Sequence, residues 1–247
     1  AGSAVAFERG NREGTARVVQ AVAEAAPEVR LVHVSSQAAL GPSPAIDGLG
    51  PDAEPHPISA YGRSKLGAEK EVRARDGLDW VIVRPPAIYG PRDIDVLQFF
   101  KLAARGVVPL PRGERWVTMA WVGDVVRGVL AAAHRRVKRG IYHLGEPYPY
   151  RMKALVQLLA RAGGLRARVV PVPETVLAVA GTAGSGLQRL GFRQVAMTRD
   201  KARELTARHW TLRTHDSLAA LGIDRWMEFP RGAALTWEWY RNEGWLR

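Results

Sequence analysis

The chain has no cysteine among its 247 residues, which excludes disulfide bonds and thiolate metal sites. It also lacks any apolar run near the ~18 residues that cross a bilayer. The longest candidates, 125–133 and 176–183, are interrupted or bordered by Arg and Gly. No basic segment followed by an apolar one stands at residue 1, so no signal peptide is expected. We therefore expect a cytoplasmic protein.

Acidic residues are scarce relative to basic ones. The 24 Asp and Glu stand against 36 Lys and Arg, which gives a net charge of +12. Such a charge can indicate nucleic acid or an anionic membrane as partner. However, only six of the basic residues are Lys, and the Arg residues are spread along the chain without a block of interleaved aromatics. A compositional bias explains the charge as well as a binding surface does, and we expect no nucleic-acid partner and no stable membrane insertion.

The N-terminal third alternates helical and strand patterns. With 47% hydrophobic residues this excludes a disordered chain, and the length suits one large domain or a domain with a small appendage. Strand–helix–strand alternation predicts parallel crossovers, hence a doubly wound α/β sheet. The expected elements are a helix at 12–26, a strand at 30–35 with Leu31, Val32 and Val34 buried, a loop at 40–57, a helix at 59–75 that Ser59 caps, and a strand at 79–84.

The remainder of the chain is expected to be mostly helical. We expect the sheet domain to comprise 1–92 and 107–145, and a helical substrate lobe to comprise 93–106 and 146–247. The elements expected beyond residue 90 are helices at 96–105, 124–135, 153–162, 175–190, 200–206 and 233–242, an extended segment at 116–122 and a strand at 141–144.

Three motifs each fall at the carboxyl end of an expected parallel strand, the edge at which such sheets bind ligands. They are Ser35-Ser36, then Tyr61 and Lys65 on one face of a helix, then Arg84-Pro85-Pro86. Each alone is commonly a cap, a solvated pair or a strand stop. A free tyrosine has a pKa near ~10, and a nearby ammonium lowers it toward the working range of a base. Ser36 could hold a substrate oxygen against Tyr61, and a hydride would need a cofactor.

In this order the motifs resemble those of the extended short-chain dehydrogenase/reductase family, the NAD-dependent epimerase/dehydratase group. Asn11-Arg12-Glu13-Gly14-Thr15 matches its Asn-x-x-Gly-Thr. The resemblance implies a Rossmann-like sheet, with Ser36, Tyr61, Lys65 and Asn11 as catalytic residues and NAD or NADP as cofactor. Val122-Gly123-Asp124 and the aromatic C-terminal segment 236–246 also resemble the family. The implied cofactor contacts are Ala1, Gly2, Ser35, Tyr61, Lys65, Pro86, Ala87 and Ile88.

The Gly-rich loop with which the family begins is absent. No G-x-G-x-x-G stands at a strand–helix junction here, and Ala1-Gly2 resembles the end of a later segment beside the adenosine. The resemblance therefore implies that the first βαβ units are missing, on the order of 60–80 residues. We expect this chain to bind dinucleotide weakly or not at all, which an NADH fluorescence titration can measure.

Two further departures concern the substrate. Sugar-nucleotide dehydratases of the family carry Asp-Glu where this chain has Gln37-Ala38, so dehydration is not expected. Where many relatives place an Arg that pairs with a diphosphate, this chain has Val117, with Arg115 two residues away. Apolar stretches such as 107–110 and 176–187 suit a hydrophobic alcohol or ketone better, although ordinary core packing explains them too.

The leading hypothesis is an oxidoreductase that interconverts a secondary alcohol and a ketone. A nucleotide-sugar epimerase, which would release no reduced cofactor, and a non-catalytic scaffold remain alternatives. The resemblance also implies a homodimer through the helices near 12–26 and 59–75. No metal is expected, because the His residues lack ligand spacing; solvated or core roles are predicted for His33, His143, His209 and His215.

Overall fold

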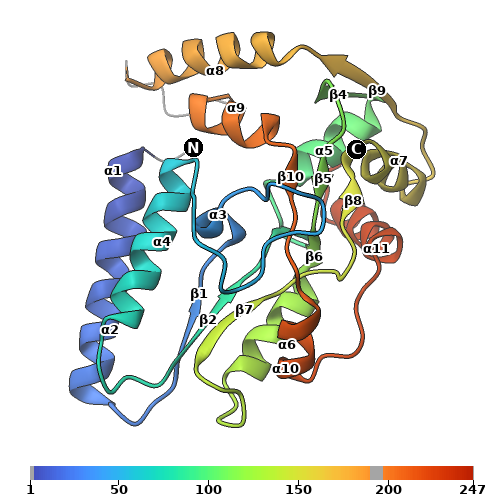
Figure 1. The fold of residues 1–247 in the computed structure, drawn as a ribbon. Coiled ribbons are helices and arrows are strands. Elements are labelled where there is room, and N and C mark those ends of the chain that lie inside the picture. The colour runs from blue at the N-terminus through green and yellow to red at the C-terminus, as the bar shows by residue number, and fades with distance from the viewer. Residues whose placement is uncertain (1–2, 190–196, 247) are drawn as a thin grey trace.

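A three-stranded parallel sheet forms the centre of the molecule (Figure 1). The structure is a computed structural model that describes residues 3–189 and 197–246. The strands are β1 (Leu31–Val34), β2 (Trp80–Arg84) and β7 (Gly140–His143), in the order β1-β2-β7. Both pairs are parallel, with Val34 opposite Val83 and Arg84 opposite His143.

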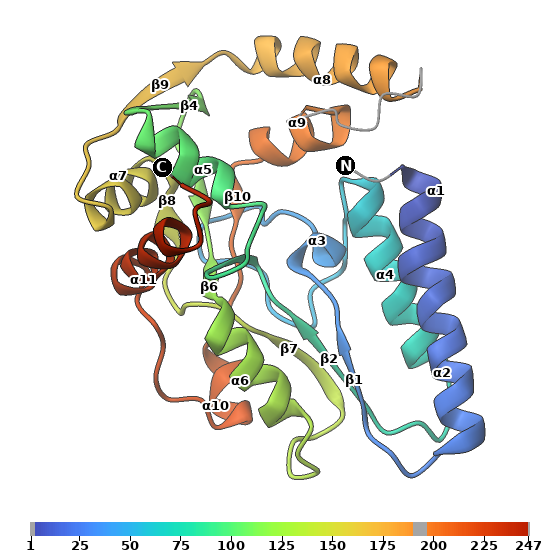
Figure 2. The same ribbon diagram turned by 180° about the vertical axis from the view of Figure 1, so that it is seen from behind.

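Helices cover both faces of this sheet, as Figures 1 and 2 show. All five residues of β2 are buried, as expected for a strand enclosed on both sides. Trp80 and Ile82 pack in one hydrophobic cluster with α2 (Gly14–Ala25) and α4 (Ala60–Arg73). Val81 and Val83 pack in another with α6 (Val122–Ala132) and α10 (His215–Leu221). The fold is therefore Rossmann-like, as predicted.

The helix before β1 contains a π-helical turn. It begins at α1 (Ala4–Phe7), earlier than expected, because the Ser3 hydroxyl caps it by accepting from the Ala6 amide at 3.1 Å. The π-helical segment Glu8–Glu13 then joins α1 to α2. Such turns add a residue to the helix and occur often at functional sites.

Smaller elements extend from the carboxyl edge of the sheet into a lobe. Among them, β3 pairs with β6, β4 pairs with β9, and β5 lies between β10 and β8. The bounds are α3 (Gln37–Leu40), β3 (Ala87–Tyr89), α5 (Leu97–Ala104), β4 (Val107–Pro111), β5 (Trp116–Val117), β6 (Met119–Trp121), β8 (Tyr150–Arg151), α7 (Met152–Ala162), β9 (Arg168–Val172), α8 (Glu174–Arg189), α9 (Arg199–Thr206), β10 (His209–Trp210) and α11 (Phe229–Asn242).

The lobe has its own aromatic core. The Phe100 ring lies 5.2 Å from Trp237 and 5.1 Å from Tyr240, both edge-on, the geometry that aromatic pairs prefer. The packing differs from the expected division of the chain at two places. Strand β4 pairs with the lobe strand β9, and α10 packs on α6 and β7 of the sheet domain.

Three local predictions have clear outcomes. Ser59 caps α4, because its hydroxyl accepts from the Gly62 amide at 3.1 Å. Asp124 lies at the strand-to-helix turn between β6 and α6, as expected. The prediction that Leu31, Val32 and Val34 are buried was wrong: Leu31 and Val32 are half-buried and Val34 is 41% exposed, because β1 is an edge strand in the described part of the chain. No helix in residues 3–189 or 197–246 has the length and hydropathy of a membrane span.

Candidate active site

The carboxyl ends of β1 and β2 and the first turn of α4 bring the predicted residues together. Ser36 follows β1 and caps α3, its hydroxyl accepting from the Ala38 amide at 3.1 Å. Tyr61 is the second residue of α4. The two hydroxyls, 25 positions apart in sequence, lie close enough that Ser36 lowers the pKa of Tyr61. The structure thus forms the pair that the sequence predicted.

A glycine lets these two segments approach. A Cβ atom at Gly62 would lie 2.2 Å from the carbonyl oxygen of Ala38, which no side chain tolerates. Gly62 stands directly after Tyr61, so the close contact of α4 with α3 sets the position of Tyr61 against Ser36. The glycine in Tyr-Gly-Arg-Ser-Lys is therefore a packing requirement.

The environment of Tyr61 keeps its phenol protonated. Burial raises its pKa, the hydrogen bond with Ser36 partly offsets this, and the carboxylates of Asp95 and Glu204 raise it further. The expectation that Lys65 lowers the pKa of Tyr61 was wrong for this structure. Burial and neighbouring carboxylates act in the opposite direction and keep the phenol protonated.

Lys65 points to the end of β1. Its ammonium donates to the Val34 carbonyl oxygen at 2.6 Å. Burial lowers the pKa of Lys65, while the Glu69 carboxylate raises it. An ammonium has three N–H donors, so donors remain for a ligand hydroxyl.

The side chain of Asn11 is connected to the backbone of Tyr61 through Ser64. The side-chain amide of Asn11 donates to the Ser64 hydroxyl at 2.9 Å, and that hydroxyl donates to the backbone carbonyl oxygen of Tyr61 at 2.8 Å. Asn11 lies in the π-helical segment, which also places the Phe7 ring 5.4 Å from the Tyr61 ring. The sequence predicted Asn11 from its motif, but nothing in its spacing indicated Phe7.

Ser35 faces the interior, away from Ser36. Its hydroxyl donates to Glu69 at 2.5 Å, and it is 4% exposed. Glu69 in turn holds Arg84 by two bonds of 2.9 and 2.7 Å, and both side chains are 1% exposed. Only the backbone of Ser35 is placed to meet a cofactor. The sequence prediction missed Glu69, although it stands four residues after Lys65 on the same helical face.

The segment after β2 lies at the same edge. Pro86 is buried, Ala87 is exposed and Ile88 is half-buried, and β3 pairs with β6 from Ala87 onward. A Cβ atom at Gly145, beyond β7, would lie 2.9 Å from the Pro86 ring, so glycine is needed behind this segment. Of the remaining expected cofactor contacts, Ala1 and Gly2 lie outside the described residues.

A small apolar pocket of about 90 Å³ lies beside this segment. Its lining contains no polar side chain. Ala87 of the candidate cofactor segment is part of the lining, and most of the other lining residues belong to the core of the lobe. The pocket therefore extends from the candidate cofactor segment into the lobe. It is lined by Ala87, Val96, Phe99, Val117, Met119, Met152, Leu155, Val156, Leu159 and Phe229.

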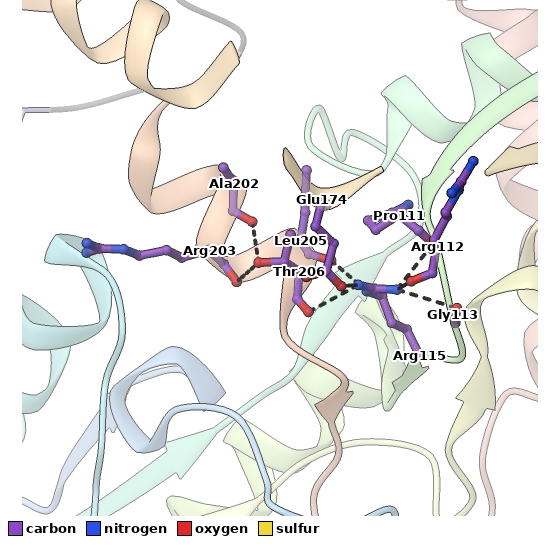
Figure 3. A network of polar contacts seen from close by, with 9 residues as sticks. All are labelled: Pro111, Arg112, Gly113, Arg115, Glu174, Ala202, Arg203, Leu205 and Thr206. Atoms are coloured by element: carbon purple, nitrogen blue, oxygen red, sulfur yellow. Dashed lines mark hydrogen bonds and ion pairs between the residues drawn. The ribbon is translucent and has the colours of Figure 1, made fainter. Parts of the chain in front are cut away.

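Arg115 is buried and already engaged (Figure 3). Its guanidinium donates to the Leu205 carbonyl at 3.1 Å, to the Thr206 carbonyl at 3.3 Å and to the Glu174 carboxylate. It also bonds the carbonyls of the turn after β4, at Pro111, Arg112 and Gly113. All its nitrogens are engaged, so Arg115 joins β4, α8 and α9 and does not reach a ligand. The guanidinium therefore cannot serve as the diphosphate partner that the chain lacks at Val117.

The N-terminus of α4 is held by the lobe. The Ala60 amide donates to the Asp200 carboxylate at 2.6 Å, and Asp200 stands in the first turn of α9. Helix α9 thereby lies over Tyr61, and its Glu204 contributes to the charge there. The sequence reasoning missed Asp200, because a contact across 140 residues leaves no local pattern.

The histidines form no metal site. No group of three His, Cys, Asp or Glu residues in the described chain is arranged to hold a metal ion. Burial lowers the pKa of His33 to about 4 and that of His143 to about 3, which keeps both neutral. His143 is fully buried, a core role as predicted, and His215 is exposed.

Known proteins with similar sequences or structures include reductases and a dehydratase. The chain is 32% identical over 243 residues to a ceramide reductase of Caulobacter vibrioides, covering 97% of this chain and 70% of that protein. It is 30% identical over 195 residues to the 4-hydroxy-2-methyl-3-oxo-4-farnesyl-3,4-dihydroquinoline-1-oxide ketoreductase of Stigmatella aurantiaca, covering 74% and 56%. A dTDP-glucose 4,6-dehydratase from Streptomyces venezuelae, solved with NAD bound, has a TM-score of 0.73 at 26% identity, covering 99% of this chain and 70% of that one.

The family-level comparison covers the sheet domain. Residues 2–145 match the model of the NAD dependent epimerase/dehydratase family. This segment includes the Ser36, Tyr61 and Lys65 positions and all three strands of the central sheet. The chain therefore belongs to this family of NAD-dependent enzymes.

Proposed function

We propose that the protein interconverts a ketone and a secondary alcohol on an apolar substrate, using NAD or NADP. The observation that carries the proposal is the apolar pocket of about 90 Å³, which is lined in part by Ala87 of the candidate cofactor segment and has no polar side chain in its lining. A nucleotide sugar needs polar and cationic partners, whereas a hydrocarbon chain needs a surface of this kind.

The residues at the carboxyl edge of the sheet fit a nicotinamide nucleotide. Lys65 has donors for ribose hydroxyls, and the backbone at Pro86–Ile88 lies at the exposed edge beside them. When bound, the nicotinamide supplies or accepts the hydride, which no side chain can do. Gly62 lets α4 pack closely on α3, and Gly145 lets the chain after β7 pack closely on Pro86, so both glycines help to position this edge.

Ser36 and Tyr61 would bind the oxygen of the substrate carbonyl group. Ser36 lies close enough to Tyr61 to lower the pKa of its phenol, so a carbonyl oxygen between the two hydroxyls could accept from both. The Tyr61 phenol is protonated at neutral pH and would donate its proton to that oxygen as the alcohol forms, and the phenolate would take it back in the reverse reaction. Asn11 positions Tyr61 through Ser64.

Three further observations support an apolar substrate over a nucleotide sugar. Val117 lines the pocket, and Arg115 is saturated by carbonyls and Glu174. Gln37, where dehydratases need an acid, is an amide that cannot protonate a leaving group. Both named reductases among the relatives act on molecules with long hydrocarbon chains, a ceramide and a farnesyl-bearing dihydroquinoline.

The first prediction tests the proton donor. Tyr61→Phe, assayed with any chain that precedes residue 1 restored, should lower kcat for ketone reduction by about 10²–10⁴-fold, the usual contribution of a general acid. The matched control is Tyr148→Phe, because Tyr148 is 79% exposed and outside the site. Circular dichroism should show both variants folded. Equal turnover of Tyr61→Phe and wild type would refute the role of Tyr61.

Substrate choice separates the proposal from an epimerase. In a series of ketones with lengthening alkyl chains, kcat/KM should rise about fourfold for each buried methylene until the pocket is filled, as ~0.8 kcal/mol per CH₂ implies. NADH or NADPH should be consumed in proportion to product. Epimerisation of a nucleotide sugar without net cofactor consumption would overturn the proposal.

We also infer a homodimer through α2 and α4. The two helices pack side by side, with Arg12 and Glu71 paired at 2.8 Å, and α2 exposes Val18 at 51%. Light scattering on a size-exclusion column measures the expected mass, and a Val18→Glu variant should shift it toward the monomer.

A further inference from the structure

Helix α8 carries an apolar stripe that faces away from the protein. Val176, Val179 and Leu187 are 53%, 69% and 46% exposed, although each is a large hydrophobic residue. Ala180 and Ala183, which are also exposed, complete the row. The spacing follows the helical period, so these side chains share one face. The opposite face packs on α9, where a Cβ atom at Gly181 would lie 2.9 Å from the Thr198 carbonyl oxygen.

This stripe stands on the part of the lobe that covers the active site. Helix α8 runs along one edge of the molecule in both views, with α9 directly beneath it (Figures 1 and 2). The Arg199 amide of α9 donates to the Ser185 hydroxyl of α8 at 2.9 Å. The next residue, Asp200, accepts from the Ala60 amide beside Tyr61. A short series of contacts thus connects the exposed stripe with the proton donor.

The surroundings of the stripe are positively charged. Between residues 166 and 208 the sequence has eight Arg or Lys residues and three carboxylates. All three carboxylates are engaged, Glu174 by Arg115, Asp200 by the Ala60 amide and Arg203, and Glu204 by Lys201, so the segment keeps an excess of five positive charges. The exposed cations of β9, α9 and the segment before β9 are Arg166, Arg168, Arg199, Lys201 and Arg203.

We propose that α8 docks the protein on an anionic lipid bilayer, with the stripe from Val176 to Leu187 lying in the headgroup boundary. A helix with apolar residues on one face and cations around it binds such a surface by burial and by charge together. A second copy of the chain fits less well, because two cationic rims would face each other. Given the proposed function, docking would bring a membrane-dissolved ketone close to the Tyr61 site.

Vesicle sedimentation tests the docking without substrate or cofactor, so its result does not depend on the proposed reaction. The protein should bind vesicles of phosphatidylcholine mixed with phosphatidylglycerol, and binding should fall at high salt and with phosphatidylcholine alone. The triple variant Val176→Ser, Val179→Ser, Leu187→Ser should bind the mixed vesicles about a hundredfold more weakly, since three apolar side chains no longer enter the boundary.

A matched control replaces exposed apolar residues elsewhere. Val126→Ser with Leu130→Ser, on α6, removes side chains that are 52% and 62% exposed and should leave vesicle binding unchanged. Turnover of a detergent-dissolved ketone should be equal in the α8 variant and wild type. The proposal is overturned if wild type does not bind mixed vesicles, or if the α8 variant and the α6 control bind alike. It is also overturned if the α8 variant only dissociates an oligomer.

Discussion

At the scale of single residues, the buried ion pair of Glu69 and Arg84 stabilises the backbone next to the candidate active site. Both side chains are 1% exposed, and Glu69 also accepts from Ser35, the neighbour of Ser36. Arg84→Met leaves the Glu69 carboxylate without its cation, which should lower the free energy of unfolding by about 3–5 kcal/mol. The double variant Glu69→Gln, Arg84→Met removes both charges and should lose less stability. Urea denaturation followed by circular dichroism measures both.

An exposed ion pair provides the comparison. Glu114 and Arg151 are paired, with side chains 64% and 53% exposed. Glu114→Gln should leave the urea midpoint unchanged within error, because solvated pairs contribute little. If the double variant at Glu69 and Arg84 were less stable than Arg84→Met alone, the penalty would not come from an unpaired buried charge.

The sequence predicted the site residues whose positions follow from neighbouring secondary structure. It missed the residue that reaches the site through a contact with a backbone group far away in the sequence. The positions of Ser36, Tyr61 and Lys65 follow from strand ends and from one helical face, which spacing reveals. Asp200 accepts from a backbone amide 140 residues away, a contact without a sequence pattern. The pKa of Tyr61 could not be predicted either, because burial and the Asp95 charge arise only after folding.

At the scale of elements, the π-helical segment Glu8–Glu13 sets the alignment of the first helix with α4. Deleting Gly10 should convert this turn to α-helix and rotate α1 by about 100° relative to α2. The Phe7 ring, now 5.4 Å from Tyr61, would then turn away. Since such ring pairs contribute ~1 kcal/mol, kcat should fall about fivefold, with helix content by circular dichroism unchanged.

Gly10→Ala is the matched control for the deletion. A Cβ atom at Gly10 would meet no atom within 4 Å, so alanine fits without strain. The substitution should raise stability by about 0.5–1 kcal/mol, because alanine is the better helix former, and leave kcat unchanged. Loss of activity in Gly10→Ala equal to that of the deletion would mean that the alignment of Phe7 is not the cause.

Element prediction succeeded where periodicity is strong. The strands β1 and β2 and the long helices α4, α7 and α11 were all expected, because each shows a clear apolar period. Strands of two residues, such as β8 and β10, contain too little sequence for a period. The π-helical turn keeps a helical composition and differs only by its extra residue. Helix α10 was missed for its brevity, seven residues from His215 to Leu221.

At the scale of the whole molecule, Glu146 joins the sheet domain to the lobe. It follows β7 and is 5% exposed. Its carboxylate accepts from the hydroxyl of Tyr150, in β8, at 2.5 Å and from the amide of Phe229, the first residue of α11, at 3.3 Å. The Tyr89 hydroxyl of β3 lies 3.5 Å away. A single carboxyl thus links three elements, including Phe229 of the apolar pocket.

The protonation of Glu146 should therefore affect the stability of the whole fold. Burial raises its pKa from 4.5 to about 7, and the charge of Asp124 adds to this, while bonds from Tyr150 and Phe229 oppose it. Because the folded pKa lies above the unfolded one, the folded state holds a proton that the unfolded state has lost. The contribution is fully present below pH about 4.5 and is lost as pH rises through about 7.

Comparison with Glu146→Gln isolates this effect from other titrations. The lowered pKa values of His33 and His143 act oppositely, since folding excludes their protons and stability falls as pH drops below about 6.5. The variant retains those histidines. The difference in unfolding free energy, wild type minus variant, should fall by about 3 kcal/mol between pH ~4.5 and ~7 and stay level above. Glu238→Gln, at an exposed carboxylate of α11, should give a flat difference. A flat difference for Glu146→Gln would contradict the prediction. It would mean that the Glu146 carboxyl stays ionised over this pH range and that its burial does not make the stability of the fold depend on pH.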